Sequence, residues 1–569
     1  MEQKKQGFGS KIGFILAAAG SAVGLGNIWR FPYLVGRHGG GAFVLVYLLS
    51  VLLLGTVVMI AEMFIGKRAQ RDIVNSYGKA NKWLKWIGLL GVMVPFIIST
   101  YYAVIGGWAS GYAVEYVINS NSIAPGEAGA AFSSFISDPV RSILFFALFL
   151  VAAILIVCGG VQKGIEKAGK ILMPALFVLL IAVIIAAMCL PGKGEGQTVV
   201  DGLTFYLGKF DFEALGWNGV IAAMGQAFFS LSLGMGVMIA YGSYTGKGIN
   251  IGKSALTVCG LDTLVALLAG FAIFPAMFAT GNSALVSEAG AGLMFIALPE
   301  VFATMGTAGN FVGFMFFVLV IFAAITSLIS LIEVVSQYTL EKYHWSRAKA
   351  TCVFGGIIGL IGLFVCLSQG YTHLTQDPET GIVSSSPVAY NLFGFDLLTY
   401  FDEVTNAVIM PILAFVACIT VGYIIKPKNV MKELEEMGSS FKGQKFWLAM
   451  TMSVTPALVL IVLIMGVIDK FKVFNNYGYV LGGAAVLIVL TFLWNFMLDS
   501  KKVQEFKAKR AAKLAVAGEC DCECNCDCNC ECDVVKETST EATETVVEET
   551  ATEEVSENAE TEVKEEVNE

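Results

Sequence analysis

The sequence predicts an all-α integral membrane protein of about twelve transmembrane helices. We expect helices 1–5 and 6–10 to form an inverted five-helix repeat in which helices 1 and 6 are broken. Of the 569 residues, 56% are hydrophobic and 15% are charged, whereas soluble proteins carry about 25% charged residues. Mean hydropathy is +0.71. The apolar residues form long blocks such as 43–63, and a bilayer core needs about 20 such residues per helix. A soluble domain does not contain a dozen such blocks.

These blocks define the individual spans. Their limits are 11–37, 42–66, 84–118, 140–159, 164–190, 215–243, 252–280, 308–340, 347–369, 398–425, 446–468 and 475–500. The third and eighth are longer than one bilayer, so we expect them to tilt or to project beyond it. The N-terminal residues have no signal-peptide pattern, because the first block is full-length and lacks a cleavage site.

Basic residues predict the orientation of the bundle. The loops after even-numbered spans carry Lys and Arg, for example Lys67 and Arg68, whereas loops 281–307 and 370–397 contain neither. By the positive-inside rule, both termini face the cytoplasm and the chain spans the cell membrane, plasma or inner, many times. The lipid bilayer is therefore an expected partner.

The sequence predicts four segments. A transmembrane transporter domain (1–500) precedes a basic juxtamembrane segment (501–518), a Cys-rich segment (519–533) and an acidic tail (534–569) that we expect to be disordered. From 519 to 569 there are 19 acidic and 2 basic residues, so the net charge of −9 comes from this part of the chain.

The Cys-rich segment holds seven of the 13 cysteines in strict alternation with other residues. Cytoplasmic thiols stay reduced, and closely spaced thiolates bind soft or borderline metals such as Zn²⁺ and Cu⁺. Strict alternation is not zinc-finger spacing. A soft-metal site and a low-complexity segment without a set role are both open interpretations.

Two spans carry clustered glycines at comparable positions. The first contains Gly20, Gly24 and Gly26, and the sixth contains Gly234 and Gly236. Glycine weakens a helix and permits conformations that free backbone N–H and C=O groups. Such groups are tolerated in a membrane only beside protein or a water-filled site. Paired interrupted helices are typical of a transporter's midplane site, although small residues also allow close helix packing.

Polar residues gather near these glycines, within otherwise apolar spans. They are Asn27, Ser230, Ser232, Asp262, Thr326 and Ser327. An ionisable group such as Asp262 inside a membrane is a functional hypothesis by default. Oxygen ligands without His or Cys suit a hard cation rather than a transition metal, and half-helix N-termini favour a carboxylate. The pattern therefore indicates a small cation bound together with a zwitterion.

Four sequence runs then resemble one family. The run AVGLGNIWRFP from Ala22 to Pro32, followed by GGGAF from Gly39, is similar to the first-helix signature of the neurotransmitter:sodium symporter family, bacterial amino acid transporters included. Residues 225–236 resemble its sixth helix, 323–327 its eighth helix and 293–302 its fourth external loop. The resemblance covers roughly 8–500.

The resemblance implies two Na⁺ sites. The first would use Ala22, Asn27, Ser230, Asp262 and the substrate carboxylate, and the second would use Gly20, Val23, Ala323, Thr326 and Ser327. Substrate-binding residues are implied as well. They are Ser21, Ala22, Gly24, Leu25, Gly26, Ile98, Tyr102, Phe229, Ser230, Ser232, Met235, Ser327 and Leu331.

The resemblance also implies gates. Phe229 would close over the substrate, and Arg30 would pair with an external acid, Asp402 or Glu403, although Thr405 is an alternative occupant of that position. The inner gate would comprise Lys5, Phe8, Tyr244 and Glu341. Glu62 is interpreted as a tie between the broken helices. Gly164 and Pro174 match a fifth-helix motif, which suggests that this helix unwinds to open a water path to the second Na⁺, although a packing kink is the alternative.

Departures from the family pattern narrow the substrate. Monoamine transporters have an aspartate where this chain has Gly24, so the resemblance implies a ligand that carries its own carboxylate, an amino acid. Asp262 stands where many relatives have asparagine, and Ala266, one turn further on, provides no charge. Asp262 is therefore the candidate fixed carboxylate for chloride-independent transport and the candidate proton acceptor on the empty return step.

We therefore expect a sodium-coupled symporter of neutral, hydrophobic (aliphatic or aromatic) L-amino acids that works by alternating access. The chain has no hydrolase triad, phosphate-binding loop or redox-cofactor motif, so we expect neither an enzyme nor a nucleic-acid-binding protein. A same-fold transporter of another small zwitterion and a non-transporting amino-acid sensor are the alternatives. The preferred amino acid, the Na⁺ stoichiometry and the oligomeric state stay open.

Overall fold

The computed structural model describes residues 7–118, 123–287, 292–370, 372–376, 383–387, 397–472 and 474–498. By its internal contacts the chain divides into Met1–Met497 and Leu498–Glu569. Lys5, the basic segment, the Cys-rich segment and the acidic tail lie outside the described residues, so the expectations about them remain predictions.

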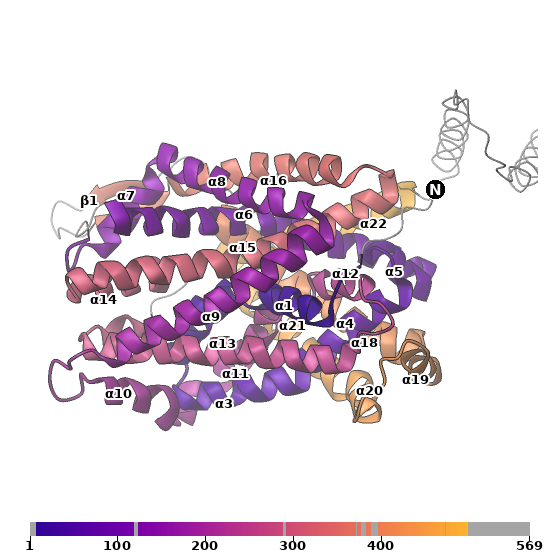
Figure 1. Cartoon of the computed structure of the whole chain (residues 1–569), viewed down its shortest axis with the longest axis horizontal. Coiled ribbons are helices and arrows are strands. Elements are labelled where there is room, and N and C mark those ends of the chain that lie inside the picture. The colour runs from indigo at the N-terminus through magenta and orange to yellow at the C-terminus, as the bar shows by residue number, and fades with distance from the viewer. Residues whose placement is uncertain are drawn as a thin grey trace, which may run out of the picture. The chain divides into compact units, whose positions relative to one another are not determined.

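The predicted spans appear as helices (Figure 1). Within the described residues, nine helices are long and apolar enough to cross a membrane. They are α3–η2–α4 (Gly41–Ala69), η3–α6 (Lys82–Ile118), α8 (Pro139–Cys158), η4–α9 (Val161–Met188), α13 (Ile251–Ala279), α15 (Thr307–Tyr343), α16 (Arg347–Gly370), α17–η8–α18–η9 (Leu397–Ile424) and α20 (Gln444–Met452) with α21 (Val454–Lys472).

Three predicted spans are accounted for differently. The first is a bent pair, α1 (Lys11–Ala22) and η1–α2 (Gly26–Arg37), with 53° between its halves. The sixth is divided into α11 (Phe212–Ser230) and α12 (Val237–Ser243), and the last is α22 (Phe474–Leu498). The fold class predicted from the sequence is confirmed as an all-α membrane bundle.

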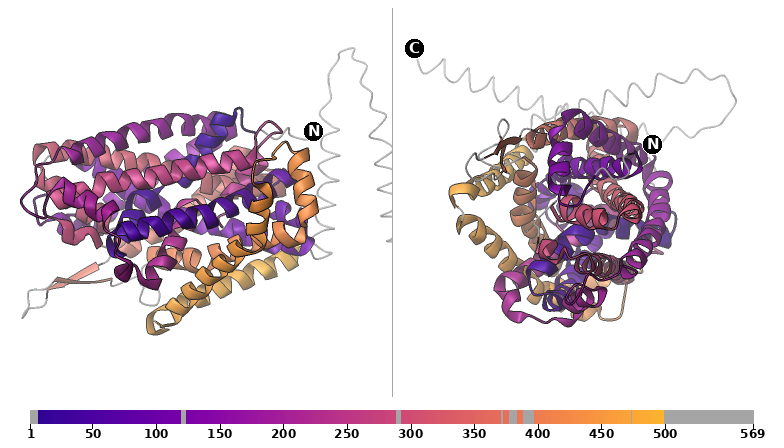
Figure 2. Two further views of the ribbon diagram at one scale, coloured as in Figure 1. Left: turned by 90° about the horizontal axis from the view of Figure 1, so that it is seen from below. Right: turned by 90° about the vertical axis from the view of Figure 1, so that its left-hand side faces the viewer.

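Short elements cap the two ends of the bundle (Figures 1 and 2). At the end nearer the described N-terminus lie α5 (Ile73–Ala80) and α19 (Pro427–Glu436). At the opposite end lie α7 (Ala128–Ser137), α10–η5 (Val199–Gly208), η6 (Ser283–Ser287), η7–α14 (Leu293–Thr304) and a hairpin of β1 (Thr372–Gln376) with β2 (Val383–Pro387). The hairpin pairs Thr372 with Pro387 in antiparallel register, within a segment that the sequence predicted only as a loop.

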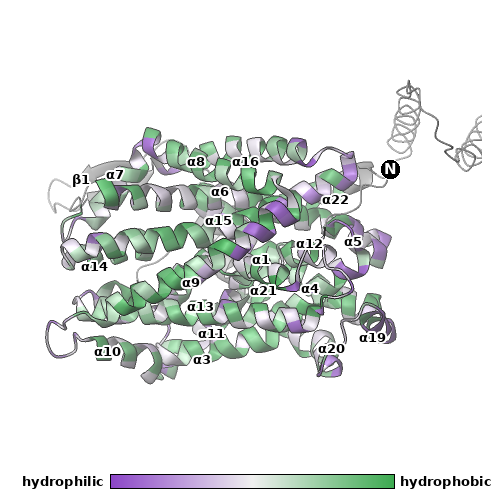
Figure 3. Cartoon of the chain, in the orientation of Figure 1, coloured by the Kyte–Doolittle hydropathy of each residue, from purple (hydrophilic) through white to green (hydrophobic). Residues whose placement is uncertain are grey.

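Burial separates inner from outer helices. The most apolar stretch of Lys82–Ile118 is 83% buried and that of Thr307–Tyr343 is 78% buried, against 28% for Val161–Met188. On the outer helices large apolar side chains face outward, as Leu155 and Ile185 do. Figure 3 shows hydrophobic residues along the helices and hydrophilic ones around α5 and α19. Because lipid tails are as apolar as leucine, this outward apolar surface suits a bilayer.

The first helix breaks after Ala22. Val23 has an extended backbone (φ −67°, ψ 103°), and the Oδ1 atom of Asn27 accepts a hydrogen bond from the Gly24 N–H at 3.0 Å. A side chain thus replaces the helical partner that the break removes, as the membrane interior requires.

The sixth helix breaks between Ser230 and Val237. Ser232, Gly234 and Gly236 all have positive φ angles, +52°, +70° and +71°. The Gly234 N–H donates to the Glu62 Oε1 atom at 2.8 Å, which agrees with the interpretation of Glu62 as a tie. A Cβ atom on Gly234 would lie 2.4 Å from the Met410 carbonyl oxygen, so only glycine fits this turn.

We predict that Gly234→Ala lowers the free energy of unfolding by about 2 kcal/mol or more, since it adds left-handed strain and a backbone clash. Thermal melting in detergent measures this. Gly225→Ala is the matched control, because Gly225 lies in α11 with no atom within 4 Å of an added Cβ, and it should keep or raise the melting temperature. Equal melting temperatures for the two variants would contradict the prediction.

Candidate functional site

Asn27, Ser230 and Asp262 meet between the two breaks. The Nδ2 atom of Asn27 donates to the Ser230 hydroxyl at 2.9 Å, the Asp262 carbonyl at 3.0 Å and the Asp262 Oδ1 atom at 2.8 Å. The Ser230 hydroxyl donates to Asp262 Oδ2 at 2.7 Å. All three residues are buried. Three oxygens thus surround the Asn27 Nδ2 atom. Hydroxyl, carbonyl and carboxylate oxygens of this kind are hard ligands, which suit Na⁺.

The residues predicted for the second Na⁺ site lie between α1 and α15. The Ser327 hydroxyl lies 3.1 Å from the Ser21 carbonyl, 3.5 Å from the Val23 carbonyl and 3.2 Å from the Ala323 carbonyl. The Thr326 hydroxyl donates to the Ala323 carbonyl at 3.0 Å, and a Cβ atom on Gly20 would lie 3.3 Å from Thr326 Cβ. The five predicted oxygen ligands therefore come from adjacent backbone and hydroxyl groups.

A cavity of about 20 Å³ lies between the broken segments. Its lining consists of Ser21, Ala22, Gly24, Gly26, Ile98, Tyr102, Phe229, Ser232, Met235, Ser327 and Leu331. All of these were predicted; Leu25 and Ser230 were also predicted but do not line it. A water molecule needs about 10–15 Å³ of such volume, so a ligand of amino-acid size enters only when the walls move apart.

The lining of the cavity combines polar and apolar groups. Among the polar groups is the Tyr102 hydroxyl, which accepts a hydrogen bond from the nearby Leu25 N–H at 3.1 Å. A Cβ atom on Gly24 would lie 2.7 Å from both the Tyr102 and the Ser327 hydroxyl oxygens, so Gly24 leaves no room for an acidic side chain. The apolar groups include Ile98, Met235 and Leu331, which are all buried.

Phe229, which lines the cavity, lies against Arg30. The Arg30 guanidinium carbon is 4.9 Å from the Phe229 ring centroid, within the range of a cation–π contact. Asp402 accepts a hydrogen bond from the Tyr101 hydroxyl at 2.8 Å and another from Asn406. Thr405 is buried, and its hydroxyl donates to the Phe401 carbonyl. An Arg30–Asp402 or Arg30–Glu403 pair thus stays a prediction.

A second polar cluster, near the described N-terminus, centres on Tyr244. Its carbonyl accepts the Phe8 N–H at 3.2 Å, and its hydroxyl donates to the Glu333 Oε1 atom at 2.6 Å. Glu333 is completely buried and pairs with Arg347 at 2.6 Å. The sequence analysis missed Glu333, although an ionisable residue inside an apolar span was the signal that identified Asp262.

Glu341, the predicted inner-gate acid, lies near Asp72. Asp72 is buried and caps α5, where it accepts hydrogen bonds from the Val74 and Asn75 N–H groups. Burial raises the pKa of Asp72, as do the hydrogen bond and the charge of the Glu341 carboxyl group, to about 7. Two carboxyl groups in contact therefore share this end of the bundle.

Other predicted or overlooked polar groups surround the breaks. Gln226 donates to the Gly26 carbonyl at 2.8 Å, and the Ser21 and Ser330 hydroxyls lie 2.6 Å apart. Gln226 and Ser330 were not singled out, because one polar residue in a helix gives no sign of what it faces. In the described part of the chain, no three His, Cys, Asp or Glu side chains gather as a metal site, and the Cys-rich segment lies outside that part.

Two broken membrane helices around a buried cavity with polar and apolar lining residues define a broken-helix membrane transporter. The model of the sodium:neurotransmitter symporter family matches residues 5–123, 132–379 and 380–503. The chain belongs to this family.

Relatives of known sequence and structure agree with this membership. An uncharacterized sodium-dependent transporter of Bacillus subtilis is 34% identical over 470 residues, which are 81% of this chain and 97% of that protein. Another, from Methanocaldococcus jannaschii, is 31% identical over 523 residues, 88% of this chain and 98% of that protein. The crystal structure of MhsT in complex with L-phenylalanine has a TM-score of 0.70 at 40% identity, and the match covers 81% of this chain and 100% of that one.

We predict that Asp72→Asn flattens the pH dependence of stability. The pKa of Asp72 is about 7 in the folded protein and about 3.9 in an unfolded chain. Between these values the folded state holds an extra proton, so the stability contributed by Asp72 falls as the pH rises through this window. Asparagine keeps the N-cap and removes the titration.

Thermal melting from pH 4.5 to 8 measures this effect as the difference between variant and wild type. Asp138→Asn is the control, since Asp138 caps α8 in the same way but has a side chain that is 40% exposed. If the Asp72→Asn profile keeps the wild-type slope, Asp72 does not titrate in this range.

Proposed function

We propose that the protein is a sodium-coupled symporter of neutral, hydrophobic L-amino acids and that it works without chloride. The observation that carries this proposal is the cavity with polar and apolar lining residues between the two helix breaks, near the Asn27–Ser230–Asp262 cluster. Family membership supports sodium coupling, since relatives are described as sodium-dependent transporters. The likeness to MhsT, solved with L-phenylalanine, supports an amino acid substrate.

The cavity suggests how a zwitterion is held. The Tyr102 hydroxyl and the Leu25 N–H, now bonded to each other at 3.1 Å, would turn to the substrate carboxylate. The side chain would lie against Ile98, Met235 and Leu331, where burial contributes about 0.8 kcal/mol for each CH₂ group. The carboxylate would complete the first Na⁺ site, so cation and substrate would stabilise one another. Binding of one then raises the affinity for the other by the same factor.

Asp262 provides a reason for sodium dependence and for chloride independence. A buried carboxylate without a full positive partner is costly, and Asp262 is completely buried and bonded to the neutral Asn27 and Ser230 side chains. A sodium ion among these oxygens would balance its charge. Because the negative charge is part of the chain, no external anion would be needed.

Uptake of radiolabelled leucine, tyrosine and tryptophan into proteoliposomes tests the proposed function. We expect accumulation with an inward sodium gradient and none when choline replaces sodium. Binding without accumulation would favour an amino-acid sensor, and no response to any of the three would favour another zwitterion.

Tyr102→Phe should raise the KM about tenfold to a hundredfold, since it removes a hydrogen bond to a charged group. The control Tyr423→Phe removes a hydroxyl that bonds only the Met452 carbonyl at the surface.

We further predict that Asp262→Asn makes transport depend on chloride. Wild-type uptake should be equal in chloride and gluconate buffers, whereas uptake by the variant should fall in gluconate and recover with chloride. Ala266→Glu, added to Asp262→Asn, places a carboxylate one helical turn away and should restore uptake in gluconate. A variant that remains active and indifferent to chloride would refute this role of Asp262.

A further inference from the structure

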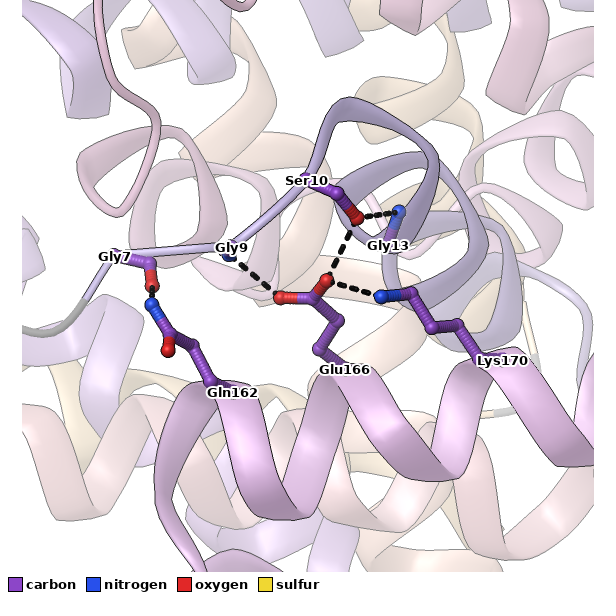
Figure 4. Close-up of polar contacts among 7 residues, drawn as sticks. All are labelled: Gly7, Gly9, Ser10, Gly13, Gln162, Glu166 and Lys170. Atoms are coloured by element: carbon purple, nitrogen blue, oxygen red, sulfur yellow. Dashed lines mark hydrogen bonds and ion pairs between the residues drawn. The ribbon is translucent and has the colours of Figure 1, made fainter.

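Glu166 joins the start of helix 5 to the start of helix 1, a role that the sequence did not suggest. Figure 4 shows its carboxylate among residues of both segments. Its Oε2 atom accepts the Gly9 N–H at 2.7 Å, and its Oε1 atom accepts the Ser10 hydroxyl at 2.8 Å and the Lys170 ammonium at 2.7 Å. Glu166 is only 3% exposed.

Glu166 completes the N-terminal cap of α1. Ser10 is the N-cap residue, and its hydroxyl oxygen accepts the Gly13 N–H at 3.0 Å while the hydroxyl donates to Glu166. A helix N-terminus leaves N–H groups without helical partners and favours a negative charge. Contact is close, because a Cβ atom on Gly13 would lie 2.0 Å from Glu166 Oε1. The same α1 carries Gly20 at its other end, beside the predicted second Na⁺ site.

The segment that bears Glu166 is an irregular part of helix 5. Residues Val161–Glu166 form a π-helical stretch, η4, directly after Gly160, whose φ is +83°. Pro174 lies within the following α9 (Lys167–Met188) and cannot donate a backbone hydrogen bond to the preceding turn. The fifth helix therefore carries two irregularities, a π-helical stretch at its start and a proline two turns further on.

A second residue of the same segment contacts the same part of the chain. The Nε2 atom of Gln162 donates to the Gly7 carbonyl at 2.8 Å (Figure 4). Gln162 and Glu166 are one turn apart, so one face of η4 holds Gly7, Gly9 and Ser10 together. The N-terminal end of helix 1 is therefore attached to this irregular part of helix 5.

We propose that Glu166 is a positioning residue that makes the release of α1 depend on the unwinding of helix 5. When residues 161–170 unwind, the carboxylate moves away with them and the cap of α1 is lost. The water path to the second Na⁺ then opens in the same event in which α1 moves. The proposal rests on the proposed function.

The hydrogen bonds of Glu166 link the two movements. If α1 left while helix 5 remained helical, the carboxylate would lose two of its three partners, Gly9 and Ser10, and α1 would lose the acceptor at its cap. Each hydrogen bond to a charged group favours the bonded state by about tenfold to a hundredfold, or about 1.5–3 kcal/mol, so departure of α1 alone is disfavoured. When residues 161–170 unwind, these bonds are broken in the same step.

Hydrogen–deuterium exchange of the full chain in lipid nanodiscs tests this coupling, with and without sodium plus leucine. In the wild type, peptides from 11–22 and from 161–170 should gain exchange together when both ligands are removed. In Glu166→Ala with both ligands present, the 11–22 peptides should exchange about tenfold or more faster, as expected for a lost charge-assisted hydrogen bond, while 175–188 remains protected.

Two further variants separate positioning from folding. Glu166→Gln keeps an oxygen that can accept the Gly9 N–H, so it should restore most of the protection of 11–22. Lys170→Gln is the matched control on the same helix face, since it removes only the ion pair, and it should exchange like the wild type. If Glu166→Ala does not fold, Ser10→Ala should give the same selective increase to a smaller extent.

Two results would overturn the coupling alone. In the first, residues 11–22 of both Glu166→Ala and Ser10→Ala exchange as slowly as in the wild type. In the second, segments 11–22 and 161–170 of the wild type respond to the ligands at different sodium concentrations. A wild type whose exchange nowhere responds to sodium or leucine would overturn the proposed function, and the coupling with it.

Discussion

Inside a membrane every backbone N–H and C=O group needs a hydrogen-bond partner, and this requirement governs the structure. Breaking a helix in lipid exposes N–H and C=O groups at a cost of several kcal/mol each, unless other protein groups bond them. Here Asn27 accepts the Gly24 N–H, Glu62 accepts the Gly234 N–H, and Gln226 donates to the Gly26 carbonyl. The side chains that repair the breaks also bring oxygens together at the centre of the bundle, so the requirement for stability and the site arise from the same contacts.

Buried acids have different partners along the bundle. At the centre, Asp262 is bonded to neutral groups, and this leaves its charge available to a cation. Near the end that holds the described N-terminus, Glu333 has Arg347 and Glu166 has Lys170. The charges of Glu333 and Glu166 are thus balanced by basic side chains, whereas that of Asp262 is not. This difference separates the proposed transport site from the ion-paired contacts near the described N-terminus.

Most of the cavity could be predicted, because the resemblance of a few sequence runs to one family implied its residues. Gly24, Gly26, Tyr102 and Ser327 all line it as expected. Glu333 and Glu166 were overlooked, since their partners are distant in the sequence: Gly9 is 157 residues from Glu166. For Arg30, alignment with the family suggested an acidic partner, but it could not show that the guanidinium lies over the Phe229 ring.

The sequence by itself determined the membrane class, the spans and the positions of both breaks, because hydrophobicity and glycine content act locally along the chain. It also indicated which oxygens would form the site, through the resemblance of a few short runs to one family. Only the tertiary structure decided which groups meet: that Asp72 lies near Glu341, that Tyr244 joins Phe8 to Glu333, and that Glu166 caps α1. These contacts connect helices far apart in the sequence, and their geometry depends on packing that no local pattern encodes.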